Sequence, residues 1–453
     1  MENKRGFTSR IGFIMSMAAF CIGIGNLWKF PYVVGNNGGG AFLLVYLIMV
    51  VLLGIPAFLI EVTLGRSAQL APIAGMAKLE GKNHTAWSAI GWVGVFSIFV
   101  ICSFATMIVG GWGGGYIVKI FSGSMQGLSA DEIGGVFGSF AGSTSCMLYS
   151  LIVSVLLWFC LCSGVKKGVE KVCSVLLPTL LIIMIGLAIY ANMLPGAREG
   201  LLWYITPDFS KIDFSVISAA ATQVFFSIGV GMCCAFVYGS YLPKDTNLVK
   251  SLSLTAVLDT FVAVLAGLLC VPALFAFDIE PTSGPSLIFI TLPHLFNEMG
   301  SFGTIFGGLF MICVFFAGFT SILGGSESLV ANILDRTKLS RKAASTIVVV
   351  AEYLFSLAFT LSFGTGALSK FTALGLGFFD FMDFLAEGLG LTIGAILMLA
   401  FIIFRWGFKR FQEEANIGAQ GAFRIHDWMK PYFYIVLPII LIVVGYCIIR
   451  MYI

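Results

Sequence analysis

Long apolar stretches alternate with short polar segments along most of the chain. About eleven of them are long enough to cross a bilayer as helices, at about 1.5 Å per residue. The runs are continuous, which is unlike the ten-residue alternation of β-barrel strands. The pattern therefore predicts an all-α polytopic membrane protein with one transmembrane domain, residues 1–453. The predicted spans are residues 10–33, 41–64, 88–121, 147–163, 168–192, 213–241, 251–277, 302–333, 341–363, 374–404 and 430–452.

Two of these spans are interrupted near their middle. The first contains Gly23-Ile-Gly-Asn-Leu-Trp-Lys-Phe-Pro31, and the sixth contains Gln223-Val-Phe-Phe-Ser-Ile-Gly-Val-Gly231. Because hydrocarbon offers no water to backbone groups freed by a break, each break implies a polar cavity, an ion or a neighbouring helix that satisfies them. The two spans begin two halves, at about 10–192 and 213–404, with one extra helix at about 430–452. Paired interruptions at matching places indicate a transporter binding site, and glycines for close helix packing are the alternative.

The few polar side chains inside the spans suit a monovalent cation. Asp259 has apolar neighbours for about two turns on either side, so its carboxylate needs a cation or a proton. Thr320 and Ser321 bring adjacent hydroxyls, which in a helix usually bond back to the preceding turn, and Asn26 brings an amide. Such oxygen ligands favour hard cations, and sodium needs little ligand charge. Glu61 in the second span is placed to reach amides released by a broken helix.

Composition excludes several other classes of protein. The chain is 58% hydrophobic and 11% charged, whereas soluble domains carry about 25% charged residues. The eleven cysteines fall in apolar runs without metal-type spacing, so we interpret them as buried hydrophobic residues and not as a disulfide framework. His84, His294 and His426 lie in predicted loops without a nucleophile–base pair, so an enzyme is not expected.

The basic loops predict the orientation. With the N-terminus in the cytoplasm, most of the short loops rich in Lys and Arg lie inside, as the positive-inside rule requires. Eleven spans then put the C-terminus outside. The first span has no obvious cleavage site, so we expect a retained helix. The segments 122–146 and 279–301 are predicted to be external loops, and 279–301 is either a lid on the outer face or an ordinary packed loop.

Seven motifs, spread over most of the chain, are specific when taken together. They are Gly25-Asn-Leu-Trp-Lys-Phe-Pro-Tyr32, Asn37-Gly-Gly-Gly-Ala-Phe42, Gly54-Ile-Pro56 with Glu61, Gln223-Val-Phe-Phe226, Tyr238-Gly-Ser-Tyr241, Phe316-Ala-Gly-Phe-Thr-Ser321 and Asp380-Phe-Met-Asp383. On these residues the chain resembles the neurotransmitter:sodium symporter family in its eleven-helix bacterial form. The resemblance implies the LeuT-type fold, a 5+5 inverted repeat with helices 1 and 6 unwound. It also implies sodium-coupled import of a small amino-acid-like zwitterion by alternating access.

The resemblance further implies two sodium sites. The first would use Cys21, Asn26, Ser227 and Asp259, and the second Ala19, Ile22, Ala317, Thr320 and Ser321. Chloride-binding members of the family carry a serine one turn after the position of Asp259, where this chain has Ala263. Because the fixed carboxylate supplies the negative charge that chloride would bring, no chloride requirement is expected.

Ionic gates are implied on both sides of the site. The outer gate would pair Lys29 with Asp383 near Gln223, and Lys lacks the bidentate fork of the Arg that the family usually has there. The inner gate would use Lys4 or Arg5 with Asp335, assisted by Ser240 and Tyr241. For each pair, the alternative is a surface contact worth under ~1 kcal/mol. Gly168 and Pro178 match a family element that unwinds to admit water, with a helix start and a proline kink as the alternative.

One position in the implied substrate pocket departs from the family pattern. The family nearly always has a Tyr, whose hydroxyl meets the substrate carboxylate, six residues before the position of Trp112, and this chain has the shorter Thr106. Gly23 stands where monoamine carriers have an Asp, which argues against a simple cationic amine. The implied substrate-binding residues are Phe20, Ile22, Gly23, Ile24, Gly25, Cys102, Thr106, Phe226, Ser227, Gly229, Met232, Ser321 and Gly325.

Two interpretations of the substrate stay open. The solute is an amino acid with an apolar or aromatic body, its carboxylate resting on sodium and the Gly23–Gly25 amides, or it is a non-α-amino acid or another small zwitterion. The expected partners are this solute and the lipid bilayer, with no nucleic acid. A monomer is expected to suffice for transport, with a dimer as the alternative. A substrate sensor without flux is a remote alternative, because the loops are too short for an extra cytoplasmic domain.

Overall fold

The computed structural model describes residues 6–279, 286–419, 421 and 424–452. Helices form almost all of its regular elements, and the one β-bridge in these ranges pairs Ala373 with Leu376. All eleven cysteines are free and most are buried, as expected for small hydrophobic residues. Lys4 and Arg5 of the predicted inner gate, and residues 280–285 of the predicted lid, lie outside the described residues.

Nine helices in the described ranges are long and apolar enough to cross a membrane. Two further spans are broken helices. One is α1 (Arg10–Cys21) followed by Gly25–Asn36 at an angle of 55°, and the other is α12 (Phe214–Ile228) followed by α13 (Cys234–Ser240). The predicted all-α fold with interrupted first and sixth spans is therefore confirmed. The nine long helices are Gly40–Ala68, Ala86–Phe121, Thr144–Cys162, Val165–Asn192, Leu248–Ala276, Phe302–Arg336, Arg341–Ser362, Phe378–Trp406 and Asp427–Tyr452.

The breaks have different local causes. After α12, the backbone turns left-handed, with φ of 68° at Gly229 and 93° at Gly231, angles that glycine adopts without a steric penalty. A Cβ at Gly231 would also overlap the carbonyl of Leu391, so the broken helix lies directly against another backbone. The first break has no left-handed residue: Ile22 leaves the helix with ψ of 88°, and helical geometry resumes at Ile24.

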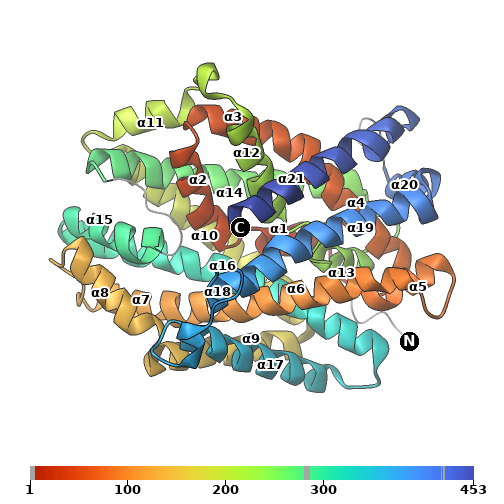
Figure 1. Cartoon of the computed structure of the whole chain (residues 1–453), viewed down its shortest axis with the longest axis horizontal. Coiled ribbons are helices and arrows are strands. Elements are labelled where there is room, and N and C mark those ends of the chain that lie inside the picture. The colour runs from red at the N-terminus through yellow and green to blue at the C-terminus, as the bar shows by residue number, and fades with distance from the viewer. Residues whose placement is uncertain (1–5, 280–285, 420, 422–423, 453) are drawn as a thin grey trace.

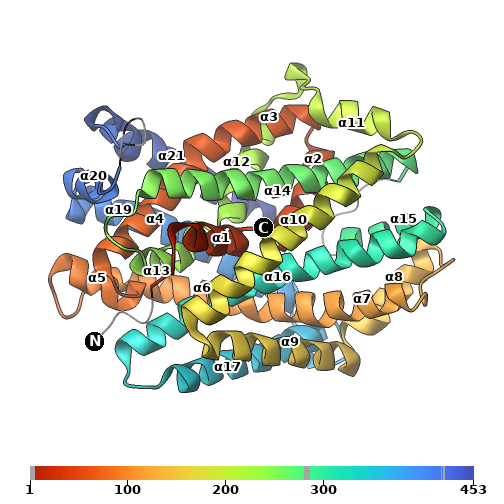
Figure 2. The ribbon, with the colours of Figure 1, turned by 180° about the vertical axis from the view of Figure 1, so that it is seen from behind.

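The first broken helix lies in the interior of the bundle. The segment α1 packs against α10 (Lys171–Asn192), α14 (Leu248–Ala276) and α16 (Ser301–Arg336). Both ribbon views place it among these three helices (Figures 1 and 2). The peptide groups freed at Ile22 are therefore surrounded by protein.

The second broken helix is held by the second span. The segment α12 packs against α3 (Gly40–Met49), and α13 packs against α4 (Ile55–Ala68). The two halves of the sixth span are thus supported by two halves of one neighbour.

Short helices gather at two opposite ends of the bundle. Figures 1 and 2 place α8 (Ala130–Ala141) and α15 (Leu292–Glu298) at one end, and α5 (Pro72–Glu80) and α20 (Phe408–Ala415) at the other. The predicted external segments 122–146 and 279–301 therefore share one end. There the rings of Phe137 and Phe289 stack with their centroids 5.4 Å apart. The described part of 279–301 is thus a packed helical segment.

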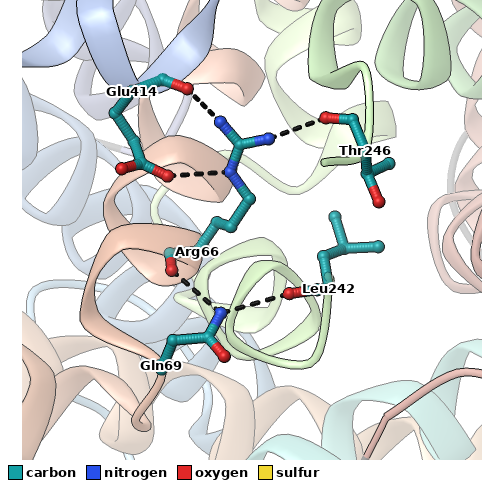
Figure 3. A network of polar contacts seen from close by, with 5 residues as sticks. All are labelled: Arg66, Gln69, Leu242, Thr246 and Glu414. Carbon is teal, nitrogen blue, oxygen red and sulfur yellow. Dashed lines mark hydrogen bonds and ion pairs between the residues drawn. The ribbon is translucent and has the colours of Figure 1, made fainter. Parts of the chain in front are cut away.

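A buried arginine joins three elements at the end that carries α20 (Figure 3). Arg66, in the last turn of α4, donates from Nε to Glu414 Oε1 at 2.8 Å and from Nη1 to the Thr246 carbonyl at 2.7 Å, and it also donates to the Glu414 carbonyl. Gln69, just beyond the helix, donates to the carbonyls of Arg66 and Leu242 at 2.9 and 3.1 Å. The planar guanidinium thus fixes α4 relative to α20 and to the loop after α13.

Arg66→Lys is expected to lower the unfolding temperature although it keeps the positive charge. An ammonium cannot reproduce the three directed bonds of the fork, and each lost charge-assisted hydrogen bond costs about 1.5–3 kcal/mol. The measurement is thermal unfolding of the purified protein in detergent. Arg198→Lys, at an exposed position, is the matched control and should unfold like the wild type. Identical unfolding temperatures for Arg66→Lys and wild type would refute the structural role of the network.

Candidate functional site

Three polar side chains meet beside the break in the first span. Asn26 lies in the π-helical segment Gly25–Lys29, Ser227 near the end of α12, and Asp259 in the middle of α14. Asn26 Nδ2 donates to Asp259 Oδ1 at 2.8 Å, and Ser227 Oγ donates to Asp259 Oδ2 at 2.7 Å. The Cys21 thiol donates to the Ile228 carbonyl at 3.7 Å, which brings the end of α1 to the end of α12.

The carboxylate of Asp259 is only 1% exposed. It belongs to none of the ion pairs formed by the described residues. A buried carboxylate without a cation is costly unless an ion or a proton joins it. The oxygens of Asn26, Ser227 and Asp259 therefore form a group suited to a hard cation.

The second predicted ion site lies between α1 and α16. Thr320 Oγ1 donates to the carbonyl oxygens of Ala19 and Ala317, at distances of 2.9 and 3.1 Å. The Phe316 carbonyl lies 3.0 Å from the same hydroxyl, so several oxygen atoms converge at this point, as a hard cation requires. Ser321 is on the wall of the adjacent cavity, and Ile22 caps α1.

A cavity of about 150 Å³ lies between the two breaks. At ~10–15 Å³ per water-sized group, it has room for a small organic solute. The predicted substrate residues on its wall are Phe20, Gly23, Ile24, Gly25, Cys102, Phe226, Ser227, Gly229, Met232 and Ser321. Other residues on the wall are Cys21, Asn26, Lys29, Ile98, Ile101, Phe104, Ala105, Gln223, Gly318, Ile322 and Glu387.

Three residues predicted to bind substrate lie off this wall. The Thr106 hydroxyl donates back to the Cys102 carbonyl at 2.8 Å. Gly325 is packed so closely that an added Cβ would lie 2.5 Å from Cys102 Sγ. Ile22 is buried and follows α1 directly, between the wall residues Cys21 and Gly23 in the sequence. Because the Thr106 hydroxyl donates its hydrogen to a carbonyl of its own helix, it offers no donor to a solute carboxylate in this conformation.

The Glu61 carboxylate supports the break in the sixth span. The backbone N–H groups of Gly231 and Phe236 donate to its two oxygens at 3.0 and 3.4 Å. This is the arrangement predicted from the second span, a carboxylate facing amides that a broken helix releases. It connects α4 to α13 across the break.

The residues predicted for the outer gate are near one another but not paired. Lys29 and Asp383 do not form an ion pair within 4.0 Å in the described part of the chain. Lys29 Nζ lies 3.6 Å from the centroid of the Phe226 ring, and the Tyr452 hydroxyl donates to Asp383 Oδ2 at 2.7 Å. Glu387, which the sequence prediction omitted, lines the cavity beside Lys29. The available signal was a carboxylate inside a predicted span, one helical turn after Asp383.

Each residue of the predicted inner gate that the structure describes contacts another described residue. Asp335 Oδ2 accepts from the Ala71 N–H at 2.6 Å, and Ser240 donates to the Val237 carbonyl at 2.6 Å. The Tyr241 hydroxyl donates to Glu327 at 2.8 Å. Glu327 is itself paired with Arg341, a partner that the sequence prediction did not include.

The segment predicted to unwind is helical in this structure. Gly168 lies in the π-helical segment Val165–Glu170, and Pro178 lies inside the continuous α10. An added Cβ at Gly168 would overlap the carbonyl of Cys160, so the glycine permits close contact with the preceding helix.

Known proteins of similar sequence and structure are transporters. The sequence matches the Sodium:neurotransmitter symporter family over residues 4–131 and 137–452. It is 34% identical over 440 residues to the uncharacterized sodium-dependent transporter YhdH of Bacillus subtilis, covering 97% of this chain and 96% of that protein. It is 25% identical over 484 residues to the human sodium- and chloride-dependent creatine transporter 1, covering 94% and 74%. The crystal structure of MhsT in complex with L-phenylalanine is similar with a TM-score of 0.85, at 34% identity, covering 98% and 99%.

Proposed function

Because this chain belongs to the Sodium:neurotransmitter symporter family and is a sodium-dependent symporter, we propose that it imports a small amino-acid-like zwitterion with an apolar or aromatic body by alternating access. The observation that carries this proposal is the cavity between the helix breaks. Phe20 and Phe226 form aromatic parts of its wall, and Asn26 and Ser227 connect it to the Asp259 carboxylate. The bound L-phenylalanine of MhsT supports an amino acid as the solute.

A non-α-amino acid or another small zwitterion is the second candidate. Thr106 favours it, because its hydroxyl bonds the Cys102 carbonyl where the family offers a tyrosine hydroxyl to an α-amino acid carboxylate. The human relative named for creatine supports the same alternative.

The proposal includes two sodium sites. The first ion binds among Cys21, Asn26, Ser227 and Asp259. The side chains of Asn26 and Ser227 already donate short hydrogen bonds to the Asp259 carboxylate. The second binds at Thr320, between the carbonyls of α1 and α16. Sodium favours one conformation only by binding it better, so an ion that ties α1 to α16 stabilises the state in which those helices are in contact.

The proposed organisation has two halves, at about 10–192 and 213–404, in the inner membrane of a bacterium. The N-terminus is cytoplasmic and the C-terminus is outside, as the basic loops indicate. A monomer suffices for transport, because one chain supplies the whole described wall of the cavity.

Thermal unfolding in detergent tests the proposal. Sodium is expected to raise the unfolding temperature relative to potassium at equal ionic strength, because ligands that bind only the folded state stabilise it. A solute screen in sodium then identifies compounds that raise the temperature further, and uptake into proteoliposomes checks their transport. Equal unfolding temperatures in the two salts, with no sodium-dependent uptake, would contradict the proposed function.

Replacing chloride with gluconate is expected to change the rate of uptake less than about twofold. Asp259 supplies a fixed negative charge next to the first ion site, and Ala263 offers no hydroxyl to a halide one turn later. The measurement is the initial rate of sodium-driven uptake in the two anions. A severalfold fall in gluconate would show that chloride takes part.

A further inference from the structure

One end of the cavity carries more negative than positive charge. We call this the gate end and define it by Lys29, Gln223 and Glu387, which all line the cavity. Asp383 lies one helical turn before Glu387, and both carboxylates act electrostatically on Lys29. Two carboxylates face one ammonium, so the local net charge is −1 when all three groups are ionised.

The existing contacts leave one of these carboxylates without a partner. The Lys29 ammonium lies over the Phe226 ring, 3.6 Å from its centroid, in a cation–π contact. Asp383 accepts a hydrogen bond of 2.7 Å from Tyr452. Glu387 takes part in no hydrogen bond or ion pair among the described residues. Its carboxylate faces the cavity without a donor.

The amide of Gln223 gives an independent indication of a ligand. This side chain is only 1% exposed, and neither Nε2 nor Oε1 has a hydrogen-bond partner in the described part of the chain. Buried polar groups are normally paired, and this one is on the cavity wall. A solute with N–H donors would satisfy Gln223 Oε1 and the Glu387 carboxylate together.

We propose that Glu387 and Gln223 bind a positively charged nitrogen of the solute at the gate end of the cavity. The inference rests on the proposed sodium-coupled import and narrows its substrate class. The solute carboxylate lies at the Gly23–Gly25 segment, and the cationic nitrogen lies at the other end, beyond an apolar stretch. This describes an ω-amino or ω-guanidino acid, or an amino acid with a cationic side chain. A carboxylate is disfavoured at the gate end because it would add to an excess of negative charge.

Two pairs of solutes that differ in a terminal ammonium test the proposal. 5-Aminopentanoate is compared with hexanoate, and L-lysine with L-norleucine, by titration of the unfolding temperature in sodium. At least one cationic member should bind roughly tenfold more tightly than its partner, the effect of one hydrogen bond to a charged group. Glu387→Gln should reduce that preference to less than about threefold and leave sodium stabilisation unchanged. Asp380→Asn, an exposed carboxylate on the same span, is the matched control and should keep the preference.

Gln223→Met is the second variant, because it removes only the amide and keeps a similar shape. This variant should bind the cationic solute severalfold more weakly than the wild type does, and it should bind the neutral partner of that solute as the wild type does. The proposal is overturned if neither cationic solute is preferred by the wild type, or if both variants keep the full preference. In those outcomes sodium stabilisation of the wild type persists, so the proposed function stands. Loss of sodium stabilisation in the wild type would overturn the proposed function instead.

Discussion

Replacing Asp259 with alanine is expected to reduce sodium-driven uptake by roughly 100-fold or more. The change removes the carboxylate that accepts hydrogen bonds from Asn26 and Ser227 at 2.8 and 2.7 Å, and it leaves both donors buried without this acceptor. Removing one partner of a buried charged contact typically costs 3–5 kcal/mol, which corresponds to roughly 100-fold or more in an equilibrium constant. The measurement is the initial uptake rate in proteoliposomes under an inward sodium gradient.

Two further variants separate ion binding from folding. Asp259→Asn keeps one acceptor oxygen, so it should retain part of the uptake but require a higher sodium concentration. Thr255→Ala removes a buried hydroxyl one turn earlier on α14, where the hydroxyl bonds only its own helix at Ser251, and it should transport within about twofold of the wild type. An Asp259→Ala protein that folds and keeps sodium-dependent uptake would exclude the carboxylate as an ion ligand.

The spans and their breaks can be predicted because they depend on neighbours in the chain. Span length follows from apolar runs, and Gly229 and Gly231 supply the left-handed angles that end α12. The importance of Asp259 could also be predicted from the sequence, because a carboxylate inside an apolar run is costly wherever the helix packs. These features needed no knowledge of the contacts between helices.

Side-chain pairing between distant spans could not be predicted in the same way. Lys29 was predicted to pair with Asp383, but the lysine lies over Phe226 and the aspartate accepts a hydrogen bond from Tyr452. Tyr452 is 69 residues from Asp383 in the chain, and only packing of the last helix shows that they meet. Gly325 was expected among the substrate-binding residues, whereas the structure packs Cys102 against it. Rotamers and close contacts decide these details, and neither follows from periodicity.

Glu61→Leu is expected to destabilise the protein and to weaken sodium binding at the same time. Leucine has a similar size but no acceptor, so the N–H groups of Gly231 and Phe236 would lose their side-chain acceptor in a buried site. At ~1–3 kcal/mol for each unpaired group, the free energy of unfolding should fall by roughly 3 kcal/mol. Because these amides set the geometry after the break, Ser227 at the end of α12 would also lose its fixed position beside Asp259. The measurements are the unfolding temperature and its increase with sodium.

Glu61→Gln keeps one acceptor oxygen, so its unfolding temperature should lie between those of the wild type and Glu61→Leu. Glu199→Gln, at an exposed position, controls for the loss of a negative charge and should match the wild type. The order wild type, Glu61→Gln, Glu61→Leu is specific to an acceptor role, because a charge effect alone would make the two Glu61 variants equal. If they are equal, the amides after Gly229 are satisfied by other groups, and the break does not depend on the second span.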